Sequence, residues 1–178
     1  MISALSIRDN NEPAKTWINL HSRELVSLNP LLVAVAPEST TAILKQGYKL
    51  DLKLEDLAEW GLAARTIRSL SKVDNELASM VLRTNHQGIA QGFILKRDNI
   101  DYTGFPEFIN LMSDLTPDIL KKCLESLDPI IVETSWSDRL KGKVEERQAA
   151  ETLINVIIDK KIKSLMDIAN ELKQLSKD

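Results

Sequence analysis

The amino-acid sequence predicts a mainly α-helical protein with a few short strands as a minor α+β component. Apolar residues recur at steps of three and four along most of the chain, which indicates helices that each bury one face. The 178 residues, 43% hydrophobic and 28% charged, can also bury a sizeable core. We therefore expect a compact helical domain over residues 1–135. A long C-terminal amphipathic helical segment, residues 136–178, either packs on this domain or serves assembly.

The first elements are separated by prolines. Asn11-Glu12-Pro13 is typical of a helix start, and the helix ends at Asn29-Pro30. Its apolar face consists of Ala14, Trp17, Ile18, His21, Leu25 and Leu28. Residues 31–36 form an apolar run that predicts either a buried strand or a short buried helix. A second helix start follows at Pro37, and Gly47 can end that helix.

The middle of the chain predicts both strand and helix. Residues 49–54 alternate polar and apolar side chains, which favours a strand. A helical pattern then continues to Leu70, with an interruption at Gly61, and resumes from Leu77 to Asn85. Residues 88–95 contain two glycines, a β-branched residue and an aromatic residue, so we predict a strand or hairpin arm there.

The C-terminal third predicts helices again. Thr116-Pro117-Asp118 opens a helix that runs to about Leu127, and Asp128-Pro129 breaks it. Ser135 or Ser137 can cap the last helical region. One apolar stripe then runs through Ala150, Leu153, Ile154, Ile157, Ile158, Ile162, Leu165, Ile168, Leu172 and Leu175. We predict two helices here rather than one, with Ser164 and Asp167 forming a capping box.

The end of this stripe is a candidate protein interface. Leu165, Ile168, Leu172 and Leu175 are spaced by 3, 4 and 3 residues, as in a coiled-coil seam. Packing of the same residues on their own domain is the competing interpretation, and the run is too short to decide between the two.

Several classes of protein are disfavoured by composition. The single cysteine, Cys123, excludes a disulfide framework and indicates a reducing compartment. The longest stretch without charge, residues 25–37, is too short to span a bilayer. The first residues lack the features of a secretion signal, so we expect a soluble, cytoplasmic protein. A net charge of −3 argues against a dedicated polyanion binder.

No catalytic constellation is visible. His21 and His86 are far apart in sequence and belong to no short-spaced metal motif. We interpret His21 as a helix-face histidine and His86 as part of a helix-terminating turn. Lys121 and Lys122 could lower the pKa of Cys123, but no base accompanies the thiol. We therefore predict no catalytic residue, no metal and no cofactor.

Residues 54–70 resemble a helix-turn-helix. Ala58 is small enough for two helices to cross closely, and Gly61 can form the turn. Ala64, Arg65 and Arg68 would then face outward from the second helix, with Lys72 one turn further on. Two residues separate Ala58 from Gly61 where the common pattern has three. An ordinary helix corner buried in the core is therefore the competing interpretation.

Two functions follow as hypotheses. The first is a non-enzymatic regulatory or assembly protein that acts through helix-mediated protein–protein contacts, including self-association into a homo-oligomer. The alternative is a nucleic-acid-binding regulator that uses residues 54–72, with Arg65, Arg68 and Lys72 as its contacts.

Overall fold

The structure, a computed structural model, describes residues 33–34, 36–47, 50, 52, 59–95 and 100–176. The α-helices of this part are α4 (Pro37–Lys45), α6 (Trp60–Val73), α7 (Asn75–Thr84), α8 (His86–Phe93), α9 (Phe105–Leu115), α10 (Pro117–Glu125), α11 (Pro129–Leu140), α12 (Val144–Lys160) and α13 (Met166–Leu175). This confirms the predicted mainly helical domain. The predicted first helix, residues 11–29, lies outside the described residues, and so does most of the predicted strand at 49–54.

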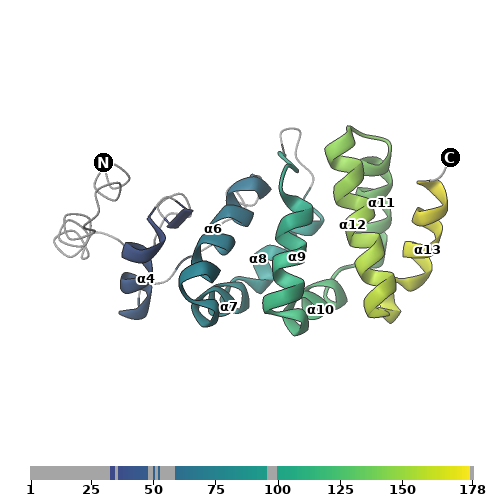
Figure 1. Cartoon of the computed structure of the whole chain (residues 1–178). Coiled ribbons are helices and arrows are strands. Elements are labelled where there is room, and N and C mark those ends of the chain that lie inside the picture. The colour runs from purple at the N-terminus through teal and green to yellow at the C-terminus, as the bar shows by residue number, and fades with distance from the viewer. Residues whose placement is uncertain are drawn as a thin grey trace.

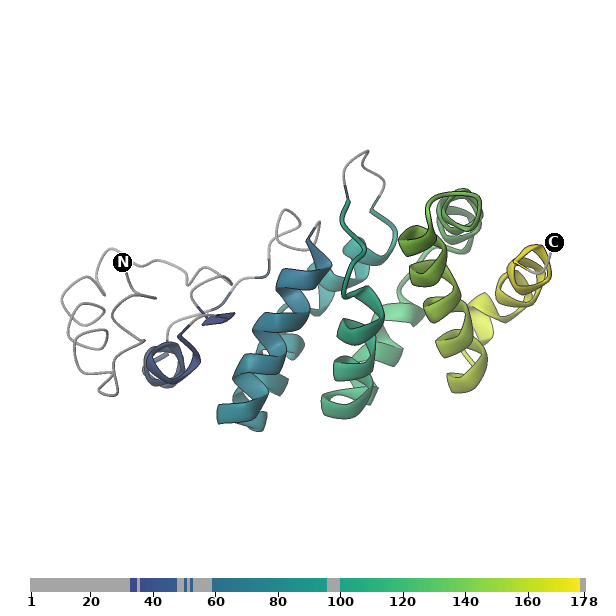
Figure 2. The same ribbon diagram turned by 45° about the horizontal axis from the view of Figure 1, so that its top comes forward.

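The helices form a row of packed pairs. α4, α6, α9 and α12 follow one another along the molecule, and α7, α8, α10 and α11 form a second layer behind them (Figure 1). Single residues connect two of the pairs: Asp74 joins α6 to α7, and Thr116 joins α9 to α10. Among the described helices, α13 packs on α11 and α12 at one end of the row, and α4 lies at the other end (Figure 2).

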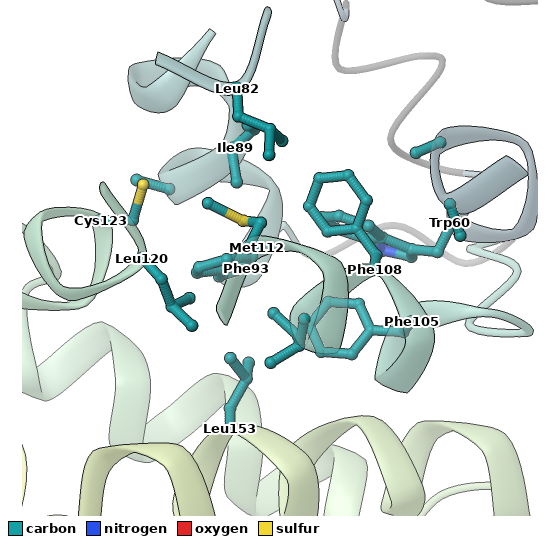
Figure 3. Close-up of a cluster of buried hydrophobic side chains, with 14 of the residues drawn as sticks. Trp60, Leu82, Ile89, Phe93, Phe105, Phe108, Met112, Leu120, Cys123 and Leu153 are labelled. Atoms are coloured by element: carbon teal, nitrogen blue, oxygen red, sulfur yellow. The ribbon is translucent and has the colours of Figure 1, made fainter. Parts of the chain in front are cut away.

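An aromatic cluster holds the centre of the row together (Figure 3). Trp60, at the start of α6, meets Phe105 of α9 edge to face with ring centroids 4.6 Å apart. Its ring also contacts Phe108 at 5.2 Å and Phe93 of α8 at 6.1 Å. These four side chains are fully buried. Each such ring removes a large apolar area from water, so the cluster anchors α6, α8 and α9 to one another.

Several helix starts confirm the sequence signals. α4 begins at Pro37 and is followed by Gly47 with a φ of +95°, and α10 begins at Pro117. A cap that the sequence analysis did not single out is Asp74, which accepts a hydrogen bond from the Leu77 amide at 3.0 Å at the start of α7. Proline in the first helical turn lacks an amide hydrogen that would have no partner there, and an aspartate cap accepts a hydrogen bond from an amide that has none within the helix.

The predicted strand at residues 88–95 is wrong, because residues 86–93 form α8. Ile89 and Phe93 lie one turn apart and are both fully buried, so packing decides the conformation over local propensity. Among the described residues, β-structure is limited to an isolated bridge between Glu59 and Asp101.

The apolar stripe lies on two helices, α12 and α13, as predicted, but the helix before them begins at Pro129 rather than after Ser135 or Ser137. Asp128 caps α11 by accepting from the Ile130 amide at 2.9 Å, so Ser135 lies within a helix and caps none. α11 also crosses the expected division at residue 135. Ser164 lies in a 3₁₀ turn, Lys163–Leu165, and makes no capping box with Asp167. α12 ends because Lys161 takes a left-handed conformation, with a φ of +53°.

Candidate functional site

The described residues form a groove between α4 and α7, here called the α4–α7 groove. Its volume is about 530 Å³, and its apolar lining comes from Leu44, Leu50, Leu77, Met80 and Val81. Leu44, Leu50 and Val81 are nearly inaccessible and form its base, whereas Met80 is 45% exposed. The groove therefore offers apolar surface at the α4 end of the row of helices.

An ion pair fixes the two walls of the α4–α7 groove relative to each other. Lys45, in the last turn of α4, lies 2.6 Å from Asp74, which caps α7. The hydrogen bond from Lys45, followed by that from the Leu77 amide, holds the pKa of the Asp74 carboxyl below its usual value. Asp74 thus stabilises the start of α7 and binds the end of α4 to it. Lys45, Asp74 and Glu76 give the apolar groove a charged rim.

Asn85 positions the chain segment that supplies Leu50. Its side-chain amide donates to the Leu50 carbonyl and accepts from the Leu52 amide, both at 2.8 Å. The amide also donates to the Val81 carbonyl at 2.8 Å, near the end of α7. One side chain therefore holds the backbone of Leu50 and Leu52 against the corner between α7 and α8.

Met80 lies between two hollows. It lines the α4–α7 groove and also, with Glu76, a shallower hollow of about 400 Å³ that extends to Asp114 and Leu115 at the end of α9. A methionine side chain is flexible and polarisable, so it adapts to apolar surfaces of different shape. Sequence reasoning placed Met80 on the apolar pattern of its helix and did not single it out. The feature that marks Met80 as a candidate contact residue is its exposure. That exposure is known only once the packing of α4 against α7 is known.

The predicted nucleic-acid-contacting residues lie together on one helix face. Arg65, Arg68 and Lys72 are all exposed on α6. The Arg68 guanidinium pairs with Glu107 of α9, and the Arg65 Nε donates to the Gly61 carbonyl at 3.2 Å. Their contact with nucleic acid stays a prediction.

The expected helix-turn-helix geometry differs from the structure at two places. Gly61 lies in the first turn of α6 rather than between two helices, and Ala64, expected to face outward, is buried. Gly61 is required there for another reason: a Cβ would stand 3.0 Å from the Thr103 carbonyl oxygen. The preceding residues, 53–58, lie outside the described part.

The predicted C-terminal interface residues have different environments. Leu165 and Leu172 are buried within the chain, and Ile168 packs partly against the core. Leu175 is 53% exposed. Association through Leu165, Ile168, Leu172 and Leu175 together would therefore require α13 to leave α11 and α12.

Cys123 and His86, the other candidate groups within the described residues, both lie against backbone carbonyls. Burial raises the pKa of the Cys123 thiol to about 12, which outweighs the charge of Lys122. The Cys123 Sγ donates to the His86 carbonyl at 3.3 Å, and the His86 Nδ1 lies 2.9 Å from the Arg83 carbonyl. Within the described residues, no group of three or more histidine, cysteine, aspartate or glutamate side chains could hold a metal ion. His21 lies outside them.

Comparisons with protein-family models, with curated proteins and with solved structures gave no match to this chain. The described helices include none that is both long and apolar enough to cross a membrane.

Proposed function

We propose that this protein is a non-enzymatic regulatory or assembly protein that binds an amphipathic helix of a protein partner in the α4–α7 groove. The observation that carries the proposal is the apolar groove itself, which two helices bound by the Lys45–Asp74 ion pair enclose. In this mode of recognition, apolar residues at helical spacing enter a groove between helices, and polar residues meet its rim.

The lining also indicates the chemistry of the partner. Met80 is the exposed apolar side chain of the lining and lies over the buried Leu44 and Val81, so a partner gains chiefly by burying aliphatic or aromatic side chains against it. Glu76 at the rim is exposed and favours a basic residue at the edge of the bound helix. The one cysteine of the chain is free and buried, which supports a cytoplasmic location for this interaction.

Selection from a display library of random 16-residue peptides tests the proposal. The full-length protein is the bait, and the Met80→Glu variant is the counter-selection. Met80 is exposed, so the variant retains the fold and places a charge at the groove. Ile130→Glu is the matched control, because Ile130 is an exposed apolar residue on α11, outside the groove.

We expect enriched peptides with apolar residues at positions i, i+3, i+4 and i+7. They should bind Ile130→Glu as well as wild type, and Met80→Glu at least about tenfold more weakly, a difference of about 1.4 kcal/mol. Equal binding to all three proteins, or enrichment of peptides without this spacing, would contradict a helix-binding groove.

Nucleic-acid binding through α6 is a second candidate function. The observation in its favour is that Arg65, Arg68 and Lys72 share one exposed face. Glu107 offsets the charge of Arg68, so nucleic acid would have to compete with an ion pair already formed.

A further inference from the structure

We propose that the partner helix lies across α7 over Met80, with apolar residues in the hollows on both sides of α7 and basic residues facing Glu76 and Asp114. This inference rests on the proposed function and deepens it, because it assigns the orientation and the charge of the partner. The α4–α7 groove is the first of the two hollows. The second, here called the α7–α9 hollow, is lined by Asn75, Glu76, Ser79, Met80, Arg83, Asp114 and Leu115.

Glu76, Met80 and Arg83 form an exposed ridge along α7. They are spaced by 4 and 3 residues, so they share one face of the helix. Leu77 lies on the side of this ridge that faces α4, and Ser79 lies on the side that faces α9. Met80, which is 45% exposed, lines both hollows. A ligand that covers Met80 can therefore reach apolar surface on either side of α7.

The walls of the α7–α9 hollow are joined by side-chain contacts, as those of the α4–α7 groove are. The Ser79 hydroxyl donates to the Leu115 carbonyl at 3.4 Å, which joins α7 to the end of α9. The Arg83 guanidinium donates to both carboxylate oxygens of Asp118 on α10, at 2.6 and 3.1 Å. Met80 and the partly buried Leu115 provide the apolar part of the lining. The two hollows are thus held on opposite sides of α7.

The separation of the two hollows matches two turns of a helix. Packed helices lie about 8 to 10 Å apart, so grooves on opposite sides of α7 are separated by about that distance. Residues i and i+7 of an α-helix are about 10.5 Å apart along its axis. A helix that crosses α7 can therefore place residue i in one hollow and residue i+7 in the other, with residue i+3 or i+4 on Met80. A helix that lies along α7 would use the α4–α7 groove alone.

The charges around the two hollows favour a basic partner. The ion pair of each hollow, Lys45–Asp74 in the first and Arg83–Asp118 in the second, is neutral as a whole.

Glu76 and Asp114 are exposed, and neither carboxylate has an ion-pair partner among the described residues. The charge that these two residues leave at the surface is negative. Lysine or arginine on the partner helix is therefore favoured, and acidic residues are disfavoured.

The position of Asp114 in its own helix is a second argument for a role in binding. Asp114 lies in the last turn of α9, where the helix carbonyls carry partial negative charge and a carboxylate is unfavourable. That turn contains no basic residue to offset the carboxylate. Residues that lower stability are typical of functional sites, because function and stability are separate requirements. Asp114 therefore suits a contact with a partner better than a role in folding.

Fluorescence anisotropy with the peptides selected on the full-length protein tests the charge assignment. Asp114→Lys should weaken binding by about three- to tenfold at low salt, because an attraction becomes a repulsion. The difference should fall below about twofold near 1 M salt, where exposed charges are screened. The melting temperature should not fall, since lysine suits a helix C-terminus. Asp159→Lys, the matched control, changes an exposed aspartate in the last turn of α12, outside both hollows, and should bind as wild type does.

Disulfide trapping tests the orientation of the helix. Ser79→Cys places a thiol in the α7–α9 hollow, across the ridge from α4. Two versions of a selected peptide carry a cysteine beside the first or the last apolar anchor. One version should form a disulfide with Ser79→Cys, and the other should not, because its cysteine lies in the α4–α7 groove. Neither should react with Asp159→Cys, and Cys123 is buried and does not compete.

The outcomes separate this inference from the proposed function. Unchanged binding to Asp114→Lys, or equal weakening by Asp159→Lys, would overturn the charge assignment. If both peptide versions bind but neither reacts with Ser79→Cys, or both react equally, the helix does not cross α7. In these cases the helix-binding groove would stand and the inference would fall. If no peptide is enriched, or binding does not depend on Met80, the proposed function fails and the inference fails with it.

Discussion

Arg139 is the one charged side chain that the structure buries among the residues it describes, and its hydrogen bonds explain how. Its two terminal nitrogens donate to the Phe93 and Leu95 carbonyls at 2.7 and 3.0 Å, at the C-terminal end of α8. Its guanidinium lies 4.9 Å from the centre of the Tyr102 ring. A cation is favoured where helix carbonyls lack partners, so Arg139 replaces the hydrogen bonds that α8 cannot make for itself.

Gly104 shows how closely α6 and α9 approach. It has a φ of +85°, and a Cβ there would stand 2.7 Å from the Gly61 Cα. We predict that Gly104→Ala lowers the free energy of unfolding by about 3 kcal/mol or more, from left-handed strain together with a backbone clash. Gly47→Ala is the control, because Gly47 has a φ of +95° but open space around it. That change should cost only about 1 to 2 kcal/mol in urea denaturation. Equal losses would show that the approach of the two glycines is unimportant.

Cys123 predicts a specific dependence of stability on pH. Its ordinary pKa of 9.0 rises to about 12 in the folded protein because the thiol is buried. Above pH 9 the unfolded chain loses this proton first, so the stabilisation present below pH 9 is lost as the pH rises toward 12. Cys123→Ala removes the effect. Its stability deficit relative to wild type should therefore shrink by about 2 kcal/mol between about pH 8 and pH 10.5 in urea denaturation. A constant deficit would mean that the thiol is not desolvated.

Helix starts that depend on neighbouring residues could be predicted from the sequence. The helices at Pro37 and Thr116 were found because proline and a neighbouring polar residue act within one turn. The helix at residues 86–93 was mistaken for a strand because its glycines disfavour a helix locally, and only the burial of Ile89 and Phe93 stabilises it. The α4–α7 groove could not be predicted from local signals either, because Lys45 and Asp74, which pair between its walls, are 29 positions apart in the sequence.

Substitutions on the exposed face of α6 test whether this face binds nucleic acid. Arg65 and Arg68 are exposed, so changing both to alanine should alter the melting temperature little. If α6 binds nucleic acid, the double variant should bind duplex DNA more weakly in fluorescence anisotropy. The salt slope should fall by about one to two units, since lost phosphate contacts release fewer counterions. Glu107→Gln is the matched variant: it frees Arg68 from its partner and should strengthen binding. Absence of wild-type binding at low salt would exclude this function.

The C-terminal helices α12 and α13 belong to the same hydrophobic core as the preceding helices. α12 packs on α9 and α11, and α13 packs on α11 and α12 (Figure 1). Leu153, Ile157 and Leu172 are buried in the same core as the aromatic cluster. Most residues of the apolar stripe are buried in this core, although Leu175 at its end is 53% exposed. Sequence alone could not say whether the chain itself or a partner covers the stripe, because both would give the same spacing.

Substitutions at two positions on α13 distinguish packing of the apolar stripe within the chain from contact between copies. Leu172 is 1% exposed, so Leu172→Asp would bury an unpaired carboxylate and should cost at least about 3 kcal/mol of stability. Leu175 is 53% exposed, so Leu175→Asp should change stability by no more than about 0.5 kcal/mol. Light scattering after size exclusion then reports the mass of the assembly. Because α13 already packs on its own chain, we expect Leu175→Asp to keep the wild-type mass. A wild-type oligomer that Leu175→Asp dissociates while the melting temperature is unchanged would instead establish the end of α13 as the interface between copies.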